Sequence, residues 1–316
     1  KIIEIVRISI SLRKFFTKYD RKESEESLFS LALLRFATEH LSFDNKKKFI
    51  DTFFEENSEF SLYDGIKKLY DEDSTEGITP KDFLLLDEDQ GIIRSKLSNV
   101  FMPTPLNKLP ETSICFTPSL KDLSDTIISC SVINYPLIVE GPNGSGKSSV
   151  FFYLSKCADA NVVRISISSS TTVEDLFGKY EPNTSSEFLR FDFQPTNFLN
   201  AISSENFNSN KDVSDDFSPL KKQWIIIEEL HLASASVLDS LAPVFNNQTD
   251  ELLLPDGTVV SKRDYFIIGL VSQPLQSQSI IHTSMIFKTP NYTESEYEQI
   301  YHNILAKNNF EDEICR

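Results

Sequence analysis

The spacing of apolar residues changes along the chain. From Ser9 to Phe54 apolar residues recur every three or four positions with charged residues between them, which predicts two or three amphipathic helices. Beyond residue 112 the apolar residues form short β-branched runs, namely PLIVE (136–140), NVVRISI (161–167), QWIIIEE (223–229) and YFIIGLV (265–271). Such runs, separated by helix-length segments, indicate a parallel sheet covered by helices on both faces. The predicted fold class is therefore α/β.

The segments between these runs have other patterns. Helices are predicted over 148–158 and 235–245, and another follows Pro290 in the stretch ESEYEQIYHNILAKN. In residues 55–111 the apolar positions show weak periodicity and are interrupted by acidic residues, Gly and Pro. This pattern predicts a linker with one short helix over 62–70. The polar stretch 203–222 is predicted to be an exposed insertion loop.

Composition and charge exclude several classes of function. The net charge is −16, from 31 Lys and Arg against 47 Asp and Glu, and this argues against a broad nucleic-acid surface. No apolar run approaches the ~20 residues of a membrane span. Four cysteines lack metal-ligand or redox spacing, so we interpret them as buried or incidental thiols in a reducing compartment: Cys115, Cys130, Cys157 and Cys315. The chain starts without Met and in mid-pattern, which suggests a piece of a longer polypeptide.

Residues 141–148 read GPNGSGKS and satisfy the phosphate-loop pattern Gly-x-x-x-x-Gly-Lys-Ser/Thr. Glycines permit close backbone approach, so that successive N–H groups can converge on phosphate oxygens. Lys147 would reach the β- and γ-phosphates, and the Ser148 hydroxyl would ligate Mg²⁺. Roughly 0.003 chance matches are expected at this composition, and the alternative is a glycine-rich turn without a ligand. The predicted ATP and Mg²⁺ contacts are Gly141, Pro142, Asn143, Gly144, Ser145, Gly146, Lys147, Ser148 and Ser149.

Two carboxylates end the run WIIIEE. A P-loop ATPase needs such a pair at the end of a neighbouring strand, to hold Mg²⁺ through water and to orient the attacking water. Glu228 is the candidate for the metal, and Glu229 is the candidate catalytic residue that polarises the water. The alternative is a buried strand that runs into an acidic loop by chance.

A third strand, YFIIGLVSQP, ends in Ser272 and Gln273. A polar side chain at this end would sense the γ-phosphate, so Gln273 is a second catalytic candidate, although the end of a strand also carries polar residues incidentally. Arg164 lies within a predicted strand and His231 follows the acidic pair. Either residue fits a structural role as well as a role in the site.

Several phrases together resemble one AAA+ module of the midasin family, the giant dynein-related ATPase of ribosome assembly with six modules in one chain. The phrases are TPSLKDLSDTI, YPLIVEGPNGSGKSSVFFYLSKCADANVVRISI, TTVEDLFGKYEP, WIIIEELHLASASVLDSLAPVFNN and LLLPDGTVVSKRDYFIIGLVSQP. The resemblance covers about 117–275 well and 9–54 more loosely. It shares Gly178 in the DLFGKYEP turn and Gly257 in the PDG hairpin.

The resemblance assigns roles unevenly. The phosphate loop matches, and Glu229 matches the acid that activates water. Glu228 stands where the family usually has Asp, so the resemblance implies an altered Mg²⁺ position, and Gln273 corresponds to the family's sensor Asn. Arg13 matches the arginine that a lid directs at the nucleotide of the preceding module.

Two features depart from the family. The segment HTSMIFKTP (282–290) has no arginine where an arginine finger is expected, and the insertion over 203–222 replaces a short join. Without the finger, this module is not expected to stimulate hydrolysis in the site that it faces.

The resemblance also implies a division of the chain and a cellular role. Residues 1–60 would be the helical lid of a preceding module, 61–112 a linker, 113–290 the large ATPase subdomain and 291–316 the start of the next lid. The implied function is remodelling of pre-60S ribosomal particles in the nucleolus and nucleoplasm, where ATP hydrolysis drives removal of assembly factors. The implied partners are neighbouring AAA+ modules of one ring and pre-60S assembly factors.

Two alternatives stay open. The chain can be a structural ring module that holds nucleotide with little or no hydrolysis. It can also be a module of another dynein-related AAA+ protein, such as a dynein motor, a giant AAA+ ubiquitin ligase or a MoxR-type chaperone.

Overall fold

A computed structural model of the chain describes residues 2–18, 79–98, 100–183, 190–204, 221–254 and 257–307, and positions 45, 48, 49 and 52. The chain divides into two units. The first comprises Lys1–Ile133, Glu140–Ala158 and Phe287–Arg316, and the second comprises Asn134–Val139 and Asp159–Ile286. No helix among the described residues is long and apolar enough to cross a membrane.

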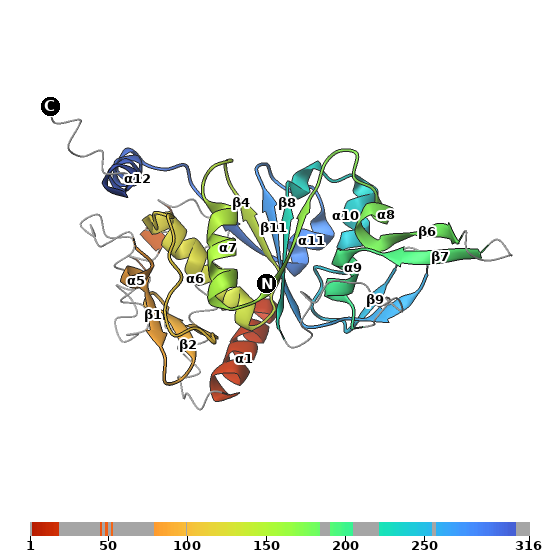
Figure 1. Ribbon diagram of the computed structural model, residues 1–316, viewed down its shortest axis with the longest axis horizontal. Coiled ribbons are helices and arrows are strands. Elements are labelled where there is room, and N and C mark those ends of the chain that lie inside the picture. The colour runs from red at the N-terminus through yellow and green to blue at the C-terminus, as the bar shows by residue number, and fades with distance from the viewer. Residues whose placement is uncertain are drawn as a thin grey trace. The chain divides into compact units, whose positions relative to one another are not determined.

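A five-stranded sheet contains most of the strand residues of the second unit, and the last residues of β4 and β12 belong to the first (Figure 1). Its order is β12 (Met285–Lys288), β4 (Leu137–Glu140), β11 (Tyr265–Val271), β8 (Gln223–Glu228) and β5 (Asn161–Ser166). Strand β8 pairs in parallel with both β11 and β5. All of β11 and the first five residues of β8 are buried, so the two strands lack the alternation of a half-exposed sheet. The four predicted runs are all strands, and the predicted α/β class is confirmed.

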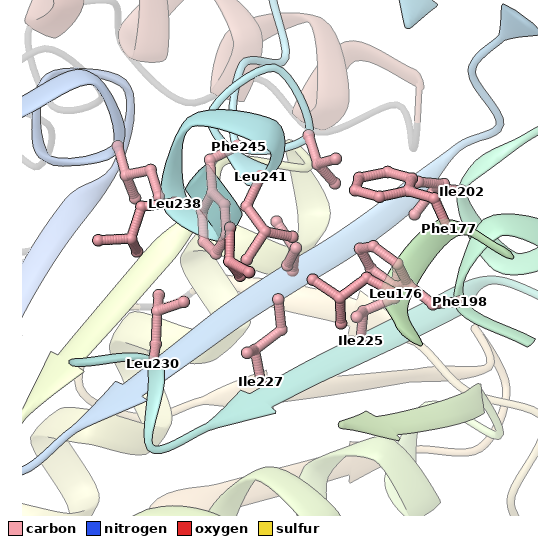
Figure 2. Packing of buried hydrophobic residues seen from close by; sticks show 14 of the residues in the cluster. Leu176, Phe177, Phe198, Ile202, Ile225, Ile227, Leu230, Leu238, Leu241 and Phe245 are labelled. Carbon is pink, nitrogen blue, oxygen red and sulfur yellow. The ribbon is translucent and has the colours of Figure 1, made fainter. Parts of the chain in front are cut away.

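The helices of this unit pack on the sheet through one apolar cluster. They are α8 (Val173–Phe177), α9 (Asn197–Ile202), α10 (Ala235–Leu241) and α11 (Gln278–Thr283). Figure 2 shows side chains from α8, α9, α10 and β8 facing one another, among them Leu176, Phe198, Ile225, Ile227 and Leu241. Each helix starts with a hydroxyl cap, for example Ser234 at α10, whose side chain accepts from the Val237 N–H. The predicted helix over 235–245 ends early at Leu241, because Pro243 has no N–H group with which to continue the helical hydrogen bonds.

Two antiparallel hairpins extend the second unit. Strands β6 (Gly178–Asn183) and β7 (Arg190–Pro195) form one, and β9 (Glu251–Leu253) and β10 (Val259–Ser261) form the other. Gly178 has φ 124°, and a Cβ there would lie 2.4 Å from the Gln194 carbonyl oxygen, so only glycine fits. The hairpin around Gly257 agrees with expectation, whereas the periodicity did not predict the β6–β7 hairpin.

The first unit contains α6 (Pro118–Val132) and α7 (Lys147–Cys157), together with α1 (Ile2–Lys18) and α12 (Glu294–Lys307). Every residue of α6 from Ser119 to Ser131 is buried, although many of these residues are polar. Hydroxyls in α6 donate to the helix's own carbonyls, as Ser124 Oγ does to Leu120 at 2.6 Å. The Asp125 carboxylate accepts from Ser95 and Ser98, so this buried charge has hydrogen-bond partners.

The predicted linker over 61–112 is wrong in its described second half. Residues Pro80–Phe83 form α5, and β1 (Leu84–Asp87), β2 (Ile92–Ser95) and β3 (Phe101–Pro103) form an antiparallel sheet. The stretch between β1 and β2 is a tight turn closed by Gly91 at φ 60°. Phe83 packs on Phe116 with ring centroids 4.8 Å apart, which anchors this sheet in the core.

Other predictions fall partly outside the described residues. Helix α1 overlaps the predicted helical region from Ser9 to Lys18 and starts earlier, at Ile2. Residues 19–44, the predicted helix over 62–70 and most of the insertion over 203–222 lie outside the described residues. Helix α12 confirms the predicted final helix. The assignments of 1–60 and 291–316 to lids stay predictions.

Candidate functional site

The loop between β4 and α7 owes its shape to three glycines of the first unit. Gly144 and Gly146 have φ of 82° and 79°, a region that side chains rarely adopt. Gly141 is needed for space instead, because a Cβ there would lie 1.7 Å from Thr289 Oγ1. Gly146 is the N-cap of α7 without a side-chain cap, so the N–H groups of the first turn keep their donor capacity.

Lys147 is held inside this loop. Its side chain is buried, with only 7% of the residue exposed, and its Nζ donates to the carbonyls of Gly141 at 2.8 Å and Pro142 at 2.5 Å. The Ser145 hydroxyl lies 3.2 Å from the same nitrogen and itself donates to Pro142. Three oxygen atoms therefore surround an ammonium group that offers three hydrogens. A buried cation is stable only with such partners.

The remaining predicted contacts lie around this loop. Ser148, in the first turn of α7, and Pro142 are half-buried, while Asn143 and Ser149 are exposed. The orphan N–H groups and the positive end of the eleven-residue α7 helix favour an anion at this position. The structure thus gives the loop the features of a phosphate-binding loop.

Two residues missed by the sequence analysis also contact the loop region within the first unit. The Tyr292 hydroxyl donates to the Ser145 carbonyl at 3.0 Å, and burial, followed by nearby Glu296, raises the pKa of Tyr292 to about 12. Glu296, which is buried near the start of α12, accepts from the Ser119 hydroxyl at 3.1 Å and from the Thr293 N–H. No sequence motif marks either residue, because each meets its partner only in the folded chain.

The acidic pair lies in the second unit, at the end of β8. Glu228 is the last residue of the strand, and its Oε2 accepts from Arg164 Nε and Nη2, both at 2.7 Å. Arg164 lies on β5 beside Ile226, and the Ser166 hydroxyl is 3.4 Å from the same carboxylate oxygen. Arg164 thus has a defined partner in Glu228, and whether it also acts in the site stays open.

Glu229 has left-handed backbone, with φ 55° and ψ 34°. This conformation is unusual for a residue with a side chain and costs about 1–2 kcal/mol. Its carboxylate lies 3.6 Å from Nε2 of the largely buried His231, and this nitrogen is 3.1 Å from the Ser272 hydroxyl. His231 therefore joins the acidic turn to the end of β11.

Gln273 is exposed directly after Ser272. It is Ser272, not Gln273, that the structure connects to the acidic turn. The role of Gln273 as a sensor stays a prediction. Arg13 is exposed on α1, and its role also stays a prediction. Within the described part of the chain, no group of three or more His, Cys, Asp or Glu residues could hold a metal ion by itself.

Comparisons with known proteins agree with the fold and the loop. Residues 136–284 match the AAA domain family of the dynein-related subfamily. A relative named midasin from Giardia intestinalis is 24% identical over 157 residues, which is 49% of this chain and 3% of that protein. A midasin from Dictyostelium discoideum is 24% identical over 165 residues, which is 52% of this chain and 2% of that protein. The chain thus spans a small fraction of the length of these curated relatives.

A solved crystal structure from Cytophaga hutchinsonii aligns over 58% of this chain and 49% of its own, at 14% identity and a TM-score of 0.38.

A first prediction concerns the tyrosine bond to the loop. Tyr292→Phe is expected to lower the free energy of unfolding by about 1 kcal/mol, because it removes a partly buried hydrogen bond to the Ser145 carbonyl. Tyr297→Phe is the matched control, since Tyr297 is exposed and lies beside Tyr292. Urea denaturation of both variants measures the difference. Equal stability would mean that the bond contributes nothing.

A second prediction concerns the strained acid. Glu229→Gly is expected to raise the free energy of unfolding by up to about 1 kcal/mol, because glycine adopts positive φ without a steric cost. Glu229→Gln keeps the strain and the side-chain length, so its stability is expected to stay near that of the wild type. Thermal unfolding followed by circular dichroism compares the three proteins. A glycine variant less stable than the glutamine variant would argue against strain at this position.

Proposed function

The chain is midasin-like and contains an AAA+ module with an α/β P-loop core, and from this premise we propose that the module binds ATP with Mg²⁺ and hydrolyses it. The observation that carries the proposal is the loop around Lys147, in which a buried ammonium is enclosed by the loop's own oxygens ahead of an uncapped helix. A phosphate would accept from the same helix N–H groups and would replace those oxygens as partner of Lys147.

The residues that would hold Mg²⁺ are oxygen donors, as this ion prefers. The half-buried Ser148 hydroxyl in the first turn of α7 fits directly. The Glu228 carboxylate fits by its chemistry, but its Oε2 already accepts from Arg164. When bound, Mg²⁺ would neutralise charge that develops on the phosphates.

Glu229 is proposed as the residue that orients and polarises the attacking water. It directly follows the last residue of β8, and its carboxylate is partly exposed, so a water can reach it. The contact with His231 would restrict the directions in which this carboxylate points. Gln273 would sense the γ-phosphate, by the resemblance alone.

At the level of the whole protein, we propose that nucleotide-driven motion remodels pre-60S ribosomal particles in the nucleus and removes assembly factors. The name of the two relatives supports this role. Neighbouring AAA+ modules of one ring would be the immediate partners, and assembly factors the substrates.

A second function is favoured by a specific observation. The ion pair between Arg164 and Glu228 occupies an oxygen of the acid proposed for the metal. A module that holds its nucleotide and hydrolyses it slowly or not at all would tolerate such a pair. This structural role in the ring is the alternative to turnover.

A third prediction tests nucleotide binding. Lys147→Ala is expected to weaken ATP binding roughly 10- to 100-fold, because it removes a charge-assisted contact to phosphate. Lys156→Ala is the matched control, because Lys156 is exposed in the last turn of the same helix. Titration with a fluorescent ATP analogue measures both affinities. Equal affinity of Lys147→Ala and the wild type would refute the assignment of the site.

A fourth prediction separates turnover from holding. If Glu229 orients the water, Glu229→Gln is expected to lower single-turnover ATP hydrolysis by about 100-fold or more while leaving ATP affinity nearly unchanged. The measurement needs the full-length protein, with the other modules identical in both samples. Equal rates in this module would favour the holding function.

A further inference from the structure

A short segment between β12 and α12 contacts the phosphate loop near both of its ends, and all of these residues belong to the first unit. Directly before the loop, the Thr289 N–H and hydroxyl both donate to the Glu140 carbonyl, at 2.8 and 3.1 Å. Near the end of the loop, the Tyr292 hydroxyl donates to the Ser145 carbonyl at 3.0 Å. The backbone of the loop is therefore held from outside by residues far along the chain.

The bond from Tyr292 fixes more than one carbonyl. The Ser145 carbonyl shares its peptide group with the Gly146 N–H, and in a planar trans peptide these two groups point in opposite directions. A donor that holds the carbonyl on one side therefore directs the N–H to the other side. Gly146 is the N-cap of α7, at the end of the helix where N–H groups favour an anion.

The local sequence alone does not determine the orientation of this peptide. A peptide flip changes ψ of the residue before it and φ of the residue after it. Gly146 has φ 79°, and glycine adopts positive and negative φ about equally. In the flipped orientation a carbonyl oxygen would take the place of the N–H and would repel a phosphate. A contact from outside the loop is needed to favour one orientation.

The surroundings of Tyr292 keep its hydroxyl at this peptide. The side chain is half-buried, and a Cβ at Gly146 would lie 3.3 Å from the Tyr292 hydroxyl oxygen and 3.0 Å from Leu120 Cδ1. At the start of α12, the Glu296 carboxylate accepts from the Ser119 hydroxyl of α6 at 3.1 Å. The start of α12 is thus attached to α6, and Tyr292 precedes it by two residues.

We propose that Tyr292 is a positioning residue for the nucleotide, because it holds the peptide between Ser145 and Gly146 in the orientation that presents an N–H to phosphate. Tyr292 acts on the phosphate through the backbone of the loop. This inference rests on the proposed function, since it assumes that phosphate binds at the loop. It involves residues of the first unit only.

The experiment measures the dissociation constant of a fluorescent non-hydrolysable ATP analogue in EDTA, using the full chain. The temperature is one at which circular dichroism shows every variant to be folded. For Tyr292→Phe we expect binding to weaken about three- to tenfold, because the flipped peptide becomes populated and the fraction of binding-competent loop falls. A purely structural role of Tyr292 would lower stability and leave the affinity of the folded protein unchanged.

Three further variants make the result specific. Tyr297→Phe removes the same group from an exposed tyrosine whose ring contacts that of Tyr292, and its affinity should equal that of the wild type. Ser119→Ala removes the hydrogen bond between α6 and Glu296 without touching the loop peptide, so it should lower stability and keep the affinity. Lys147→Ala shows how much of the measured binding occurs at this loop.

The outcomes distinguish the two proposals. Unchanged affinity in Tyr292→Phe, with binding still weakened in Lys147→Ala, would overturn this inference and leave the proposed function standing. An equal loss of affinity in Ser119→Ala would also overturn it, because the effect would then follow the attachment of α12 and not the loop peptide. If Lys147→Ala binds the analogue as tightly as the wild type, the proposed function fails and this inference falls with it.

Discussion

The parallel pairing of β8 with a strand on each side is the constraint on which the second unit depends. Five of its six residues are buried, so the backbone polar groups of β8 can be satisfied only by β11 and β5. Three consecutive isoleucines suit such a strand, because both of its faces are covered. Within β8, a charged residue is found only at the last position, where the strand is no longer buried. The acids therefore come together at the carboxyl end of β8, in line with Ser166 on β5.

The shape of the phosphate loop in the first unit depends on a different requirement. The buried ammonium group of Lys147 needs hydrogen-bond acceptors around it. The ammonium of Lys147 takes its oxygen partners from the loop itself. The loop can offer them because glycine at 144 and 146 permits backbone that turns its carbonyls inward. Contacts from later in the chain support this shape: Thr289 donates to the Glu140 carbonyl, and Tyr292 donates to Ser145. The loop motif is local, but its geometry depends on residues almost 150 positions away.

Features with a local cause were predictable from the sequence. The four strands were found because β-branched runs bounded by polar residues form buried strands, and the loop was found because its glycines and lysine have fixed spacing. The β1–β3 sheet was missed, since strands of three or four residues around an acidic turn give too little periodicity. The sequence also did not predict the contacts of Tyr292 and Glu296, or the pairing of Arg164 with Glu228. These contacts join residues far apart in sequence, and no spacing rule connects them.

Lys147 in the first unit and Arg164 in the second differ in the free-energy cost of exchanging their hydrogen-bond partners. Lys147 is buried, so it can leave its carbonyl partners only when another oxygen takes their place at once, and a phosphate meets this requirement with a full negative charge. Arg164 is largely exposed, so water can take the place of its carboxylate. Under the proposed function, a phosphate would meet a lysine that is already positioned and largely buried, whereas a metal ion at Glu228 would have to displace an exposed guanidinium. Burial thus makes the contacts of Lys147 harder to exchange than those of Arg164, because only Arg164 can pass its partner to water.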